Sequence, residues 1–266
     1  MMVGARGLVR HLGGRAVLAG LDLEVDDGET LVLLGRSGSG KSVFLKHVIG
    51  LLPVEEGTLH VLGEDVTRAT PRTWNRLRRE VAMVFQGAAL FDSMTVGDNV
   101  ALALRHHARA PEAEILGRVA ASLGFVGLTD TESLRPSSLS GGMRKRVGIA
   151  RAIALKPRLL LYDEPTSGLD PVTSDVINRL IRRLQQETGV TSIVVTHDMQ
   201  SAYFIADRVA LLHQGRIRFR GTPDALRKSE DPIVRQFVLG TSLDLSTPTG
   251  GGAPGPSGSG AAFGPA

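Results

Sequence analysis

The sequence predicts an α/β fold with a mostly parallel sheet, preceded by an antiparallel β region and interrupted by a helical region. Three observations predict this fold. Short apolar runs typical of strands alternate with amphipathic helices, a glycine-rich loop joins one such run to a helix, and two carboxylates end another run. With 266 residues, of which 42% are hydrophobic, the chain can fill a sizeable core.

The first part of the chain, residues 3–34, is predicted to consist of strands. Leu21, Leu23 and Val25 alternate with acidic residues, as expected for a strand with one buried face. The turn signal Asp27-Gly28 is followed by the apolar run 31–34, which predicts a strand buried on both faces. A glycine-rich loop and an apolar-periodic helix over residues 42–51 complete a strand, loop and helix unit.

The middle of the chain, residues 112–160, is predicted to be mainly helical. Apolar residues repeat there at helical spacing, and a second helix is expected to begin near Gly141. Leu159 to Tyr162 predict a second buried strand at the end of this region.

Strands and helices alternate again in the last third of the chain. Residues 172–184 predict an amphipathic helix and residues 191–196 a β-branched strand. Residues 208–220 predict a hairpin that turns at Gln214-Gly215. From Ser246 onward the chain is Gly, Pro, Ser, Thr and Ala with a single Phe and no charge, so residues 246–266 are predicted to be a disordered tail after a domain of residues 1–245.

The composition limits the compartment and the partners. The chain has no Cys, which fits a reducing compartment such as the cytosol. No run approaches the roughly 18 apolar residues that cross a bilayer, and the N-terminus lacks the apolar core of a signal peptide, so a partner would have to supply membrane spans. Lys and Arg exceed Asp and Glu only by 31 to 27, and aromatic residues make up 4%, so a nucleic-acid partner is not expected.

One segment matches the complete phosphate-loop pattern G-x-x-x-x-G-K-[ST] between the predicted strand and helix that the pattern requires: Gly35, Arg36, Ser37, Gly38, Ser39, Gly40, Lys41 and Ser42. The glycines let main-chain N–H groups turn inward around phosphates, and the helix N-terminus adds partial positive charge. Lys41 is expected to reach the β- and γ-phosphates, and Ser42 is expected to offer its hydroxyl to Mg²⁺. A chance glycine-rich turn would not explain Lys-Ser at a strand-to-helix junction.

Two adjacent carboxylates end the second buried strand. Asp163 and Glu164 stand at the carboxyl end of that strand, where ligands of open α/β sheets collect. Asp163 is expected in the Mg²⁺ shell. Glu164 is expected to face the other way, where it would polarise or deprotonate the water that attacks the γ-phosphoryl group. On its own such a pair is usually a solvated strand end, but the buried run and the phosphate loop favour a catalytic role.

A further motif precedes these carboxylates. Leu139-Ser140-Gly141-Gly142-Met143 resembles the signature motif of ABC transporter ATPases, which normally ends in Gln, and the resemblance to this family extends from Gly13 to Gly240. Ser140 and the amides of Gly141 and Gly142 open a predicted helix and so present donors to an anion, which in the family is the γ-phosphate held by the opposite protomer. A simple helix cap at Ser140 is compatible with that interpretation.

Three other segments resemble elements of the same family in the expected order. Gln86 resembles the glutamine that links Mg²⁺ to the helical subdomain and to the membrane partner. Residues 167–170 resemble the loop that crosses between protomers, and Asp170 is therefore expected to bind nucleotide. His197 resembles the switch histidine that contacts the γ-phosphate, although a lone histidine at a strand end is more often structural.

The resemblance implies a phosphate-loop ATPase domain with an inserted helical subdomain at about residues 87–158. It also implies hydrolysis of ATP with Mg²⁺ by a homodimer, with Lys41, Gln86, Glu164 and His197 as the catalytic residues and Ser42, Gln86 and Asp163 as the metal ligands. The protein is expected to lie peripherally on the cytoplasmic face of the inner membrane, where it would drive an integral-membrane permease.

Three details are similar to the Mla/Mkl ATPases that energise lipid transport with MCE-domain proteins: Met143 followed by Arg144-Lys145-Arg146, Ala88-Ala89-Leu90-Phe91 after Gln86, and Asp231-Pro232 leading to Val234-Arg235-Gln236-Phe237. This branch implies a phospholipid cargo and an MCE-domain partner. The alternatives are an amino-acid type importer, a non-transport ABC protein acting on ribosomes or DNA, and a small-molecule kinase. A single phosphate loop without heptads disfavours the second, and the signature motif disfavours the third.

One departure from the family concerns adenine. The family usually stacks adenine on an aromatic residue near the N-terminus, but no Phe, Tyr or Trp precedes Phe44. The equivalent position is Leu12, so Leu12 or His11 is expected to pack against the base instead.

Overall fold

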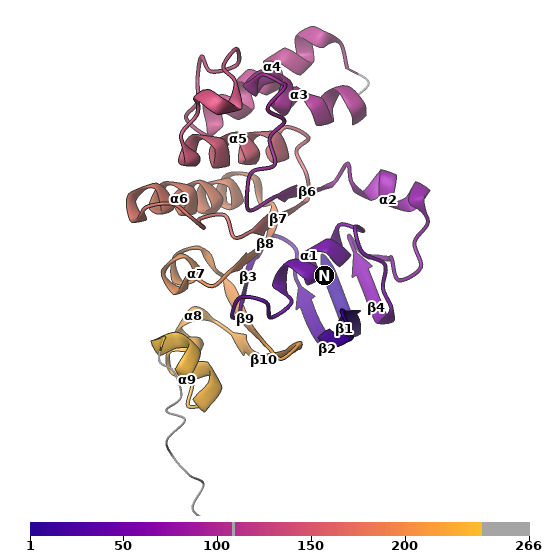
Figure 1. Ribbon diagram of the computed structural model, residues 1–266. Coiled ribbons are helices and arrows are strands. Elements are labelled where there is room, and N and C mark those ends of the chain that lie inside the picture. The colour runs from indigo at the N-terminus through magenta and orange to yellow at the C-terminus, as the bar shows by residue number, and fades with distance from the viewer. Residues whose placement is uncertain (108–109, 241–266) are drawn as a thin grey trace, which may run out of the picture.

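The computed structural model describes residues 1–107 and 110–240, and Figure 1 shows how the elements are arranged. Two sheets lie side by side in the middle of the molecule, with a group of helices at one end and helix α9 at the other (Figure 1). The predicted tail, residues 246–266, lies outside the described residues.

The smaller sheet is antiparallel and has the strand order β2-β1-β4-β5. Its strands are β1 (Val3–Leu12), β2 (Arg15–Val25), β4 (Glu56–Val61) and β5 (Glu64–Asp65). The predicted β region at the start of the chain is confirmed, since β1 and β2 form an antiparallel hairpin in which Leu21, Leu23 and Val25 of β2 are buried at alternate positions.

The larger sheet has the strand order β10-β9-β3-β8-β7-β6 and is parallel except at β10. Its strands are β3 (Thr30–Leu34), β6 (Val81–Val84), β7 (Leu159–Asp163), β8 (Thr191–Thr196), β9 (Arg208–His213) and β10 (Arg216–Gly221). The two buried strands, the β-branched strand and the hairpin at Gln214-Gly215 are thereby confirmed. Leu34 pairs with Thr196 and Asp163 with Val195, so β3, β8 and β7 end at one edge.

The helices of the described residues are α1 (Lys41–Val48), α2 (Pro71–Leu77), α3 (Val96–His107), α4 (Glu112–Phe125), α5 (Gly141–Ile153), α6 (Pro171–Thr188), α7 (Met199–Ile205), α8 (Pro223–Arg227) and α9 (Pro232–Leu239), with a 3-10 turn at Pro136–Ser138. The predicted helices are present as α1, α4, α5 and α6, and within the described part of the chain the structure adds five that were not individually predicted. The start of α5 at Gly141 is as predicted. Helix α1 ends earlier than residue 51, because Gly50 has a φ of +69° and lies against the Trp74 ring, where a Cβ would come within 2.2 Å.

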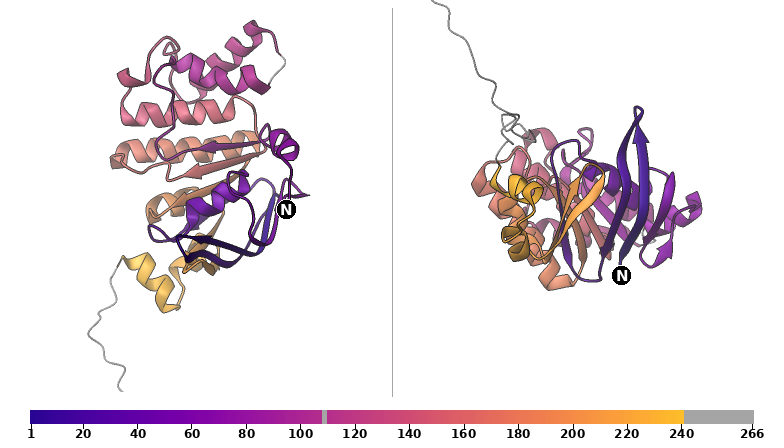
Figure 2. Two further views of the ribbon diagram at one scale, coloured as in Figure 1. Left: turned by 45° about the vertical axis from the view of Figure 1, so that its right-hand side comes forward. Right: turned by 90° about the horizontal axis from the view of Figure 1, so that it is seen from below.

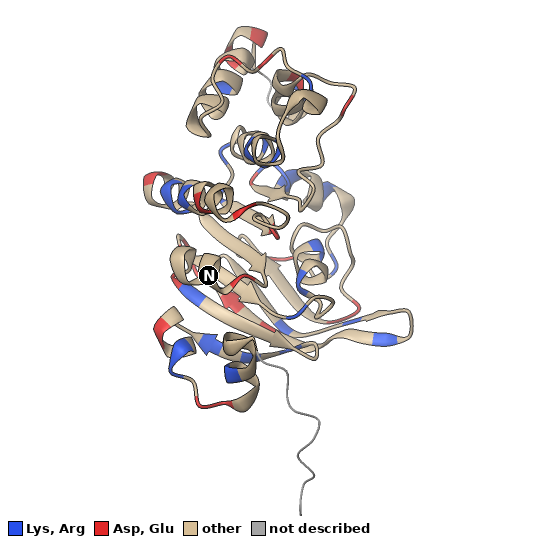
Figure 3. Ribbon diagram, turned by 60° about the vertical axis from the view of Figure 1, so that its left-hand side comes forward, with Lys and Arg blue, Asp and Glu red and all other residues tan. Residues whose placement is uncertain are grey.

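Both faces of the larger sheet are covered, which explains why its strands are continuous apolar runs. Leu159 and Leu161 of β7 face the core shared with α1 and the smaller sheet, while Leu160 and Tyr162 face the core shared with α3 to α6. Helices α3, α4 and α5 pack on one another beyond α6 (Figures 1 and 2). Figure 3 shows Lys and Arg on several separate elements with Asp and Glu among them, in line with the small charge excess.

Candidate functional site

The phosphate loop joins β3 to α1, and two of its glycines, Gly35 and Gly40, lie where a side chain would not fit. A Cβ on Gly35 would lie 2.6 Å from the Ser39 hydroxyl and 2.7 Å from the Leu212 carbonyl oxygen. Gly40 has a φ of +106°, and a Cβ there would lie 2.8 Å from the Val17 carbonyl oxygen. Gly35 is therefore needed for close approach, and Gly40 both for close approach and for its left-handed backbone.

Lys41 begins α1 and turns its ammonium back over the loop. Nζ donates to the carbonyl oxygens of Gly35 at 2.8 Å and Arg36 at 3.2 Å. Burial lowers the pKa of Lys41, and the neighbouring charges of Glu164 and Asp163 oppose that shift. The ammonium thus lies at the loop, among the main-chain groups that would surround a phosphate.

Asp163 ends β7 beside the start of α1. The Ser42 hydroxyl donates to its Oδ1 at 2.7 Å. A hydroxyl and a carboxylate oxygen therefore meet next to the phosphate loop, as the sequence predicts for the two residues assigned to Mg²⁺.

Glu164 follows directly and has a φ of +48°, a left-handed backbone that interrupts the alternation of the strand. Its Oε1 lies 3.6 Å from Lys41 Nζ, and its Oε2 accepts from the Thr196 hydroxyl at 3.4 Å. Both carboxylates thus face the phosphate loop, and the expectation that Glu164 faces away from Asp163 is wrong. The reason is the backbone turn at Glu164, which no residue-type pattern indicates.

His197 follows the end of β8, next to the same carboxylate. Its Nδ1 lies 3.1 Å from Oε1 and 3.0 Å from Oε2 of Glu164, while 62% of its side chain is exposed. An imidazole bonded to a carboxylate and open on its other side fits a contact to a ligand better than a core position.

Gln86 lies beyond β6 with its side chain exposed, and its Nε2 donates to the Ser167 hydroxyl at 3.3 Å. Gln86 borders a cavity of about 640 Å³, whose lining does not include Asp163. The predicted residues that line this cavity are Arg36, Ser37, Gly38, Lys41, Ser42, Gln86, Glu164 and His197.

Helix α9 forms a further wall of the cavity through Ile233, Gln236 and Phe237. The sequence does not predict this wall as part of a site. Gln236 and Phe237 do belong to the segment after Asp231 that is similar to the Mla/Mkl ATPases. His11 and Leu12 do not line the cavity: Leu12 pairs with Arg15 at the turn of the β1–β2 hairpin, and the His11 amide donates to Glu55 at 2.9 Å.

The signature residues lie apart from this cavity. Ser140 caps α5 by accepting from the Met143 amide at 3.2 Å, which confirms the helix-cap interpretation. Gly142 lies against α6, where a Cβ would come within 2.4 Å of the Thr173 methyl. Asp170 caps α6, accepting from the amides of Val172 and Thr173 at 3.0 Å each.

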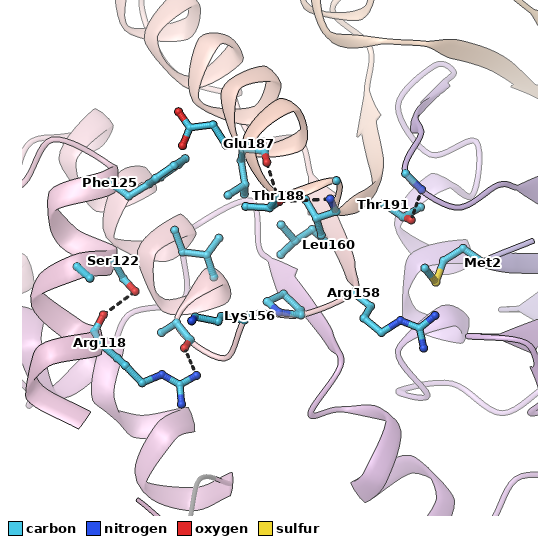
Figure 4. A pocket seen from close by; sticks show the side chains of 18 of the residues that line it. Met2, Arg118, Ser122, Phe125, Lys156, Arg158, Leu160, Glu187, Thr188 and Thr191 are labelled. Atoms are coloured by element: carbon cyan, nitrogen blue, oxygen red, sulfur yellow. Dashed lines mark hydrogen bonds between the residues drawn. The ribbon is translucent and has the colours of Figure 1, made fainter. Parts of the chain in front are cut away.

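A larger cavity, about 1040 Å³, lies among α4, the end of α5, the start of β7 and the end of α6 (Figure 4). Its hydroxyls bond within its own walls: Ser122 donates to the Arg118 carbonyl at 2.8 Å and Thr188 to the Leu184 carbonyl at 2.7 Å. None of the phosphate-loop residues lines it, so its greater volume does not make it the nucleotide site.

The fold and the smaller cavity together define a phosphate-loop ATPase. Residues 18–167 match the family model for ABC transporters. The chain therefore belongs to the ABC transporter family, as an ATP-hydrolysing, ATP-binding subunit.

Curated relatives and a solved structure agree with this assignment to the ABC transporter family. A protein of Mycobacterium leprae named probable ribonucleotide transport ATP-binding protein mkl is 39% identical over 90% of this chain and 69% of its own length. The intermembrane phospholipid transport ATP-binding protein MlaF of Haemophilus influenzae is 38% identical over 91% of each chain. The methionine import ATP-binding protein MetN of Mesorhizobium japonicum is 42% identical over 88% of this chain and 64% of its own length. A dimeric ATP-binding cassette bound to ADP and Pi in a post-hydrolysis state superposes with a TM-score of 0.77 at 30% identity, covering 84% of this chain and 99% of that one.

Proposed function

We propose that this chain hydrolyses MgATP in the cavity beside the phosphate loop and that two copies of it energise an integral-membrane permease. The observation that carries the catalytic part is the convergence of Lys41, Asp163 and Glu164 at one edge of the sheet, with Glu164 also bonded to His197. These groups come from α1, β7 and the end of β8, so the fold itself assembles them.

Glu164 is the group that takes the proton of the attacking water. A carboxylate that is 12% exposed and held by His197 and Thr196 has a restricted orientation, which a general base requires. Lys41 and the loop amides bind the β- and γ-phosphates, and the exposed ring of His197 contacts the γ-phosphate while Nδ1 orients the base.

The donor set beside the loop suits Mg²⁺. Ser42 and Asp163 offer oxygens that lie 2.7 Å apart and would hold the ion, and the side-chain oxygen of Gln86 would be the third protein ligand. Mg²⁺ commonly keeps several waters and takes few protein ligands. When bound, the ion neutralises charge on the phosphates.

The nucleotide site is completed by a second copy of the chain. Ser140, Gly141, Gly142 and Asp170 lie outside the cavity of their own chain, although the first three open a helix and so suit an anion. The similar cassette bound to ADP and Pi is dimeric, which supports a homodimer in which each signature segment faces the partner's phosphate loop.

The transporter moves phospholipid, with the chain bound to a permease at the cytoplasmic face of the inner membrane and an MCE-domain protein as a further partner. The support comes from the branch-like segments at Met143, Ala88 and Asp231 and from the relative named as a phospholipid transport subunit, nearly all of which is matched. Among the described residues no helix is both long and apolar enough to cross a bilayer.

An importer of a small solute is the second candidate, favoured by the 42% identity to the methionine importer subunit. The test is to reconstitute the chain with the permease encoded beside its gene in proteoliposomes. We expect ATP-dependent transfer of fluorescent phospholipid to acceptor vesicles, and none with Glu164→Gln. ATP-dependent uptake of labelled methionine without lipid transfer would replace the lipid proposal with the importer.

A further inference from the structure

Lys145, in the second turn of α5, is a lysine with only 7% of its surface exposed. Its ammonium donates to two main-chain carbonyl oxygens, that of Gln86 and, at 3.2 Å, that of Glu164. A buried ammonium is costly unless its donors are satisfied, so these bonds account for its position.

The two acceptors belong to Glu164, whose own backbone is left-handed, and to Gln86, which stands two residues before a left-handed pair. Glu164 has a φ of +48°, and Ala88 and Ala89, just after Gln86, have φ values of +60° and +48°. Non-glycine residues in this region persist only where the surroundings hold them. The single Nζ of Lys145 donates to a main-chain carbonyl oxygen in each of these two segments. Lys145 does not itself line the nucleotide cavity.

Helix α5 connects this ammonium to the signature segment. Ser140 caps the helix, Gly141 and Gly142 form its first turn, and Lys145 stands one turn further on. The helix contacts α3 and α4 on one side and β6 and α6 on the other, as Figure 1 shows. A displacement of its first turn would therefore be carried to Lys145 as a rigid-body movement.

We propose that Lys145 is a positioning residue that couples the signature segment, which serves the partner's nucleotide site, to Gln86 and Glu164 of its own site. This rests on the composite site of the proposed function. Burial lowers the pKa of Lys145, while the charges of Glu164 and Asp163 oppose the shift. Coupling through such a residue makes hydrolysis at the two sites of a dimer cooperative.

The test compares Lys145→Met, which keeps the length but removes the donors, with Lys145→Gln, whose neutral amide keeps two donors. The matched control is Arg146→Met. Arg146 is the next residue of the same helix and donates to the carbonyls of Val126 and Gly127 at 3.1 Å each, away from the nucleotide cavity. Each variant is assayed for ATP affinity, kcat, Hill coefficient and melting temperature.

Lys145→Met is expected to lower kcat about tenfold or more, since displacing a positioned group by about 1 Å can cost up to about a hundredfold. Its Hill coefficient should fall toward about 1 while ATP affinity stays within about twofold, because no phosphate contact is lost. Lys145→Gln should recover part of both losses. Arg146→Met should lose stability yet keep kcat and the Hill coefficient within about twofold of the unsubstituted protein.

The proposal is overturned if Lys145→Met and Arg146→Met lower kcat and the Hill coefficient equally at similar melting temperatures. If Lys145→Met does not fold, Lys145→Gln decides, because it must still lower the Hill coefficient more than the control does. Failure of the unsubstituted protein to hydrolyse ATP would overturn the proposed function as well. Hydrolysis without cooperativity would overturn the coupling alone.

Discussion

Glu164→Gln is expected to slow hydrolysis strongly and at the same time to increase the stabilisation that ATP gives the protein. Glutamine keeps the size of the side chain and a hydrogen bond to His197, but it cannot accept the proton of the attacking water. A general base contributes about 10²- to 10⁴-fold to a rate, so kcat should fall by a factor in that range.

The effect on stability follows from the charge that is removed. Lys41 Nζ and Glu164 Oε1 are 3.6 Å apart, with side chains 6% and 12% exposed. Two charges at about 4 Å attract by about 4 kcal/mol at an effective dielectric constant near 20. Desolvation of both groups offsets most of this, and Lys41 keeps its bonds to Gly35 and Arg36. Without nucleotide, the free energy of unfolding of the variant should therefore be lower by about 1–3 kcal/mol. Its melting temperature should be lower by about 2–4 °C for each kcal/mol.

ATP should recover this loss, because its phosphates bring negative charge to the ammonium that lacks its carboxylate. Thermal unfolding with and without ATP, in EDTA to prevent turnover, measures the shift, and phosphate release with Mg²⁺ measures kcat. The ATP-induced shift should be larger in Glu164→Gln than in the unsubstituted protein by a few degrees, since a ligand that binds only the folded state adds its binding free energy to stability.

Glu187→Gln is the matched control. This glutamate pairs with Arg183 on the exposed face of α6, with about half of each side chain accessible. Its removal should change stability by no more than about 1 kcal/mol and leave the ATP-induced shift unaltered. An equal ATP-induced shift in Glu164→Gln and the unsubstituted protein would refute the charge argument, and retention of most of kcat would refute the assignment of the base.

Lys41→Ala should weaken ATP binding about ten- to hundredfold, since it removes a charged donor to phosphate; titration with a fluorescent ATP analogue measures this, and unchanged affinity would contradict the assignment. Glu164→Gln protein should elute from a sizing column as a dimer with ATP and as a monomer without it. Adding Ser140→Arg should abolish the dimer but not ATP binding, and a double variant that still dimerises would leave Ser140 as a helix cap alone. Burial, followed by the charge of Arg10, lowers the pKa of His47 from 6.5, so the unfolded chain binds more protons than the folded one below that pH. The contribution of His47 to stability should therefore be full above pH 6.5 and decline below it. Urea unfolding between about pH 7.5 and about pH 5 measures this, and His47→Gln should show a smaller decline than the unsubstituted protein.

Most of the fold and the phosphate loop can be predicted from the sequence because their signals are local. The pattern ending in Lys41-Ser42 lies within eight residues, and the strand at Leu159 is a continuous apolar run because both of its faces are covered. The direction of Glu164 has no such signal, since it depends on one backbone angle. The bonds of Lys145 to Gln86 and Glu164 join residues 59 and 19 positions apart, and only the packing of α5 brings them together.

The wall formed by α9 shows how sheet order can determine which residues border a site. Asp231 caps α9 and pairs with Arg218 of β10 at 2.7 Å. Strand β10 is antiparallel to β9, and the end of β9 lies against the phosphate loop at Gly35. Val234 of α9 is buried in the core, and together with this ion pair it places α9 so that Phe237 lines the cavity. Because β9 is the neighbour of β3 in the sheet, an aromatic side chain from near the end of the described chain borders the phosphate loop, and a search confined to the N-terminal hairpin at Leu12 misses it.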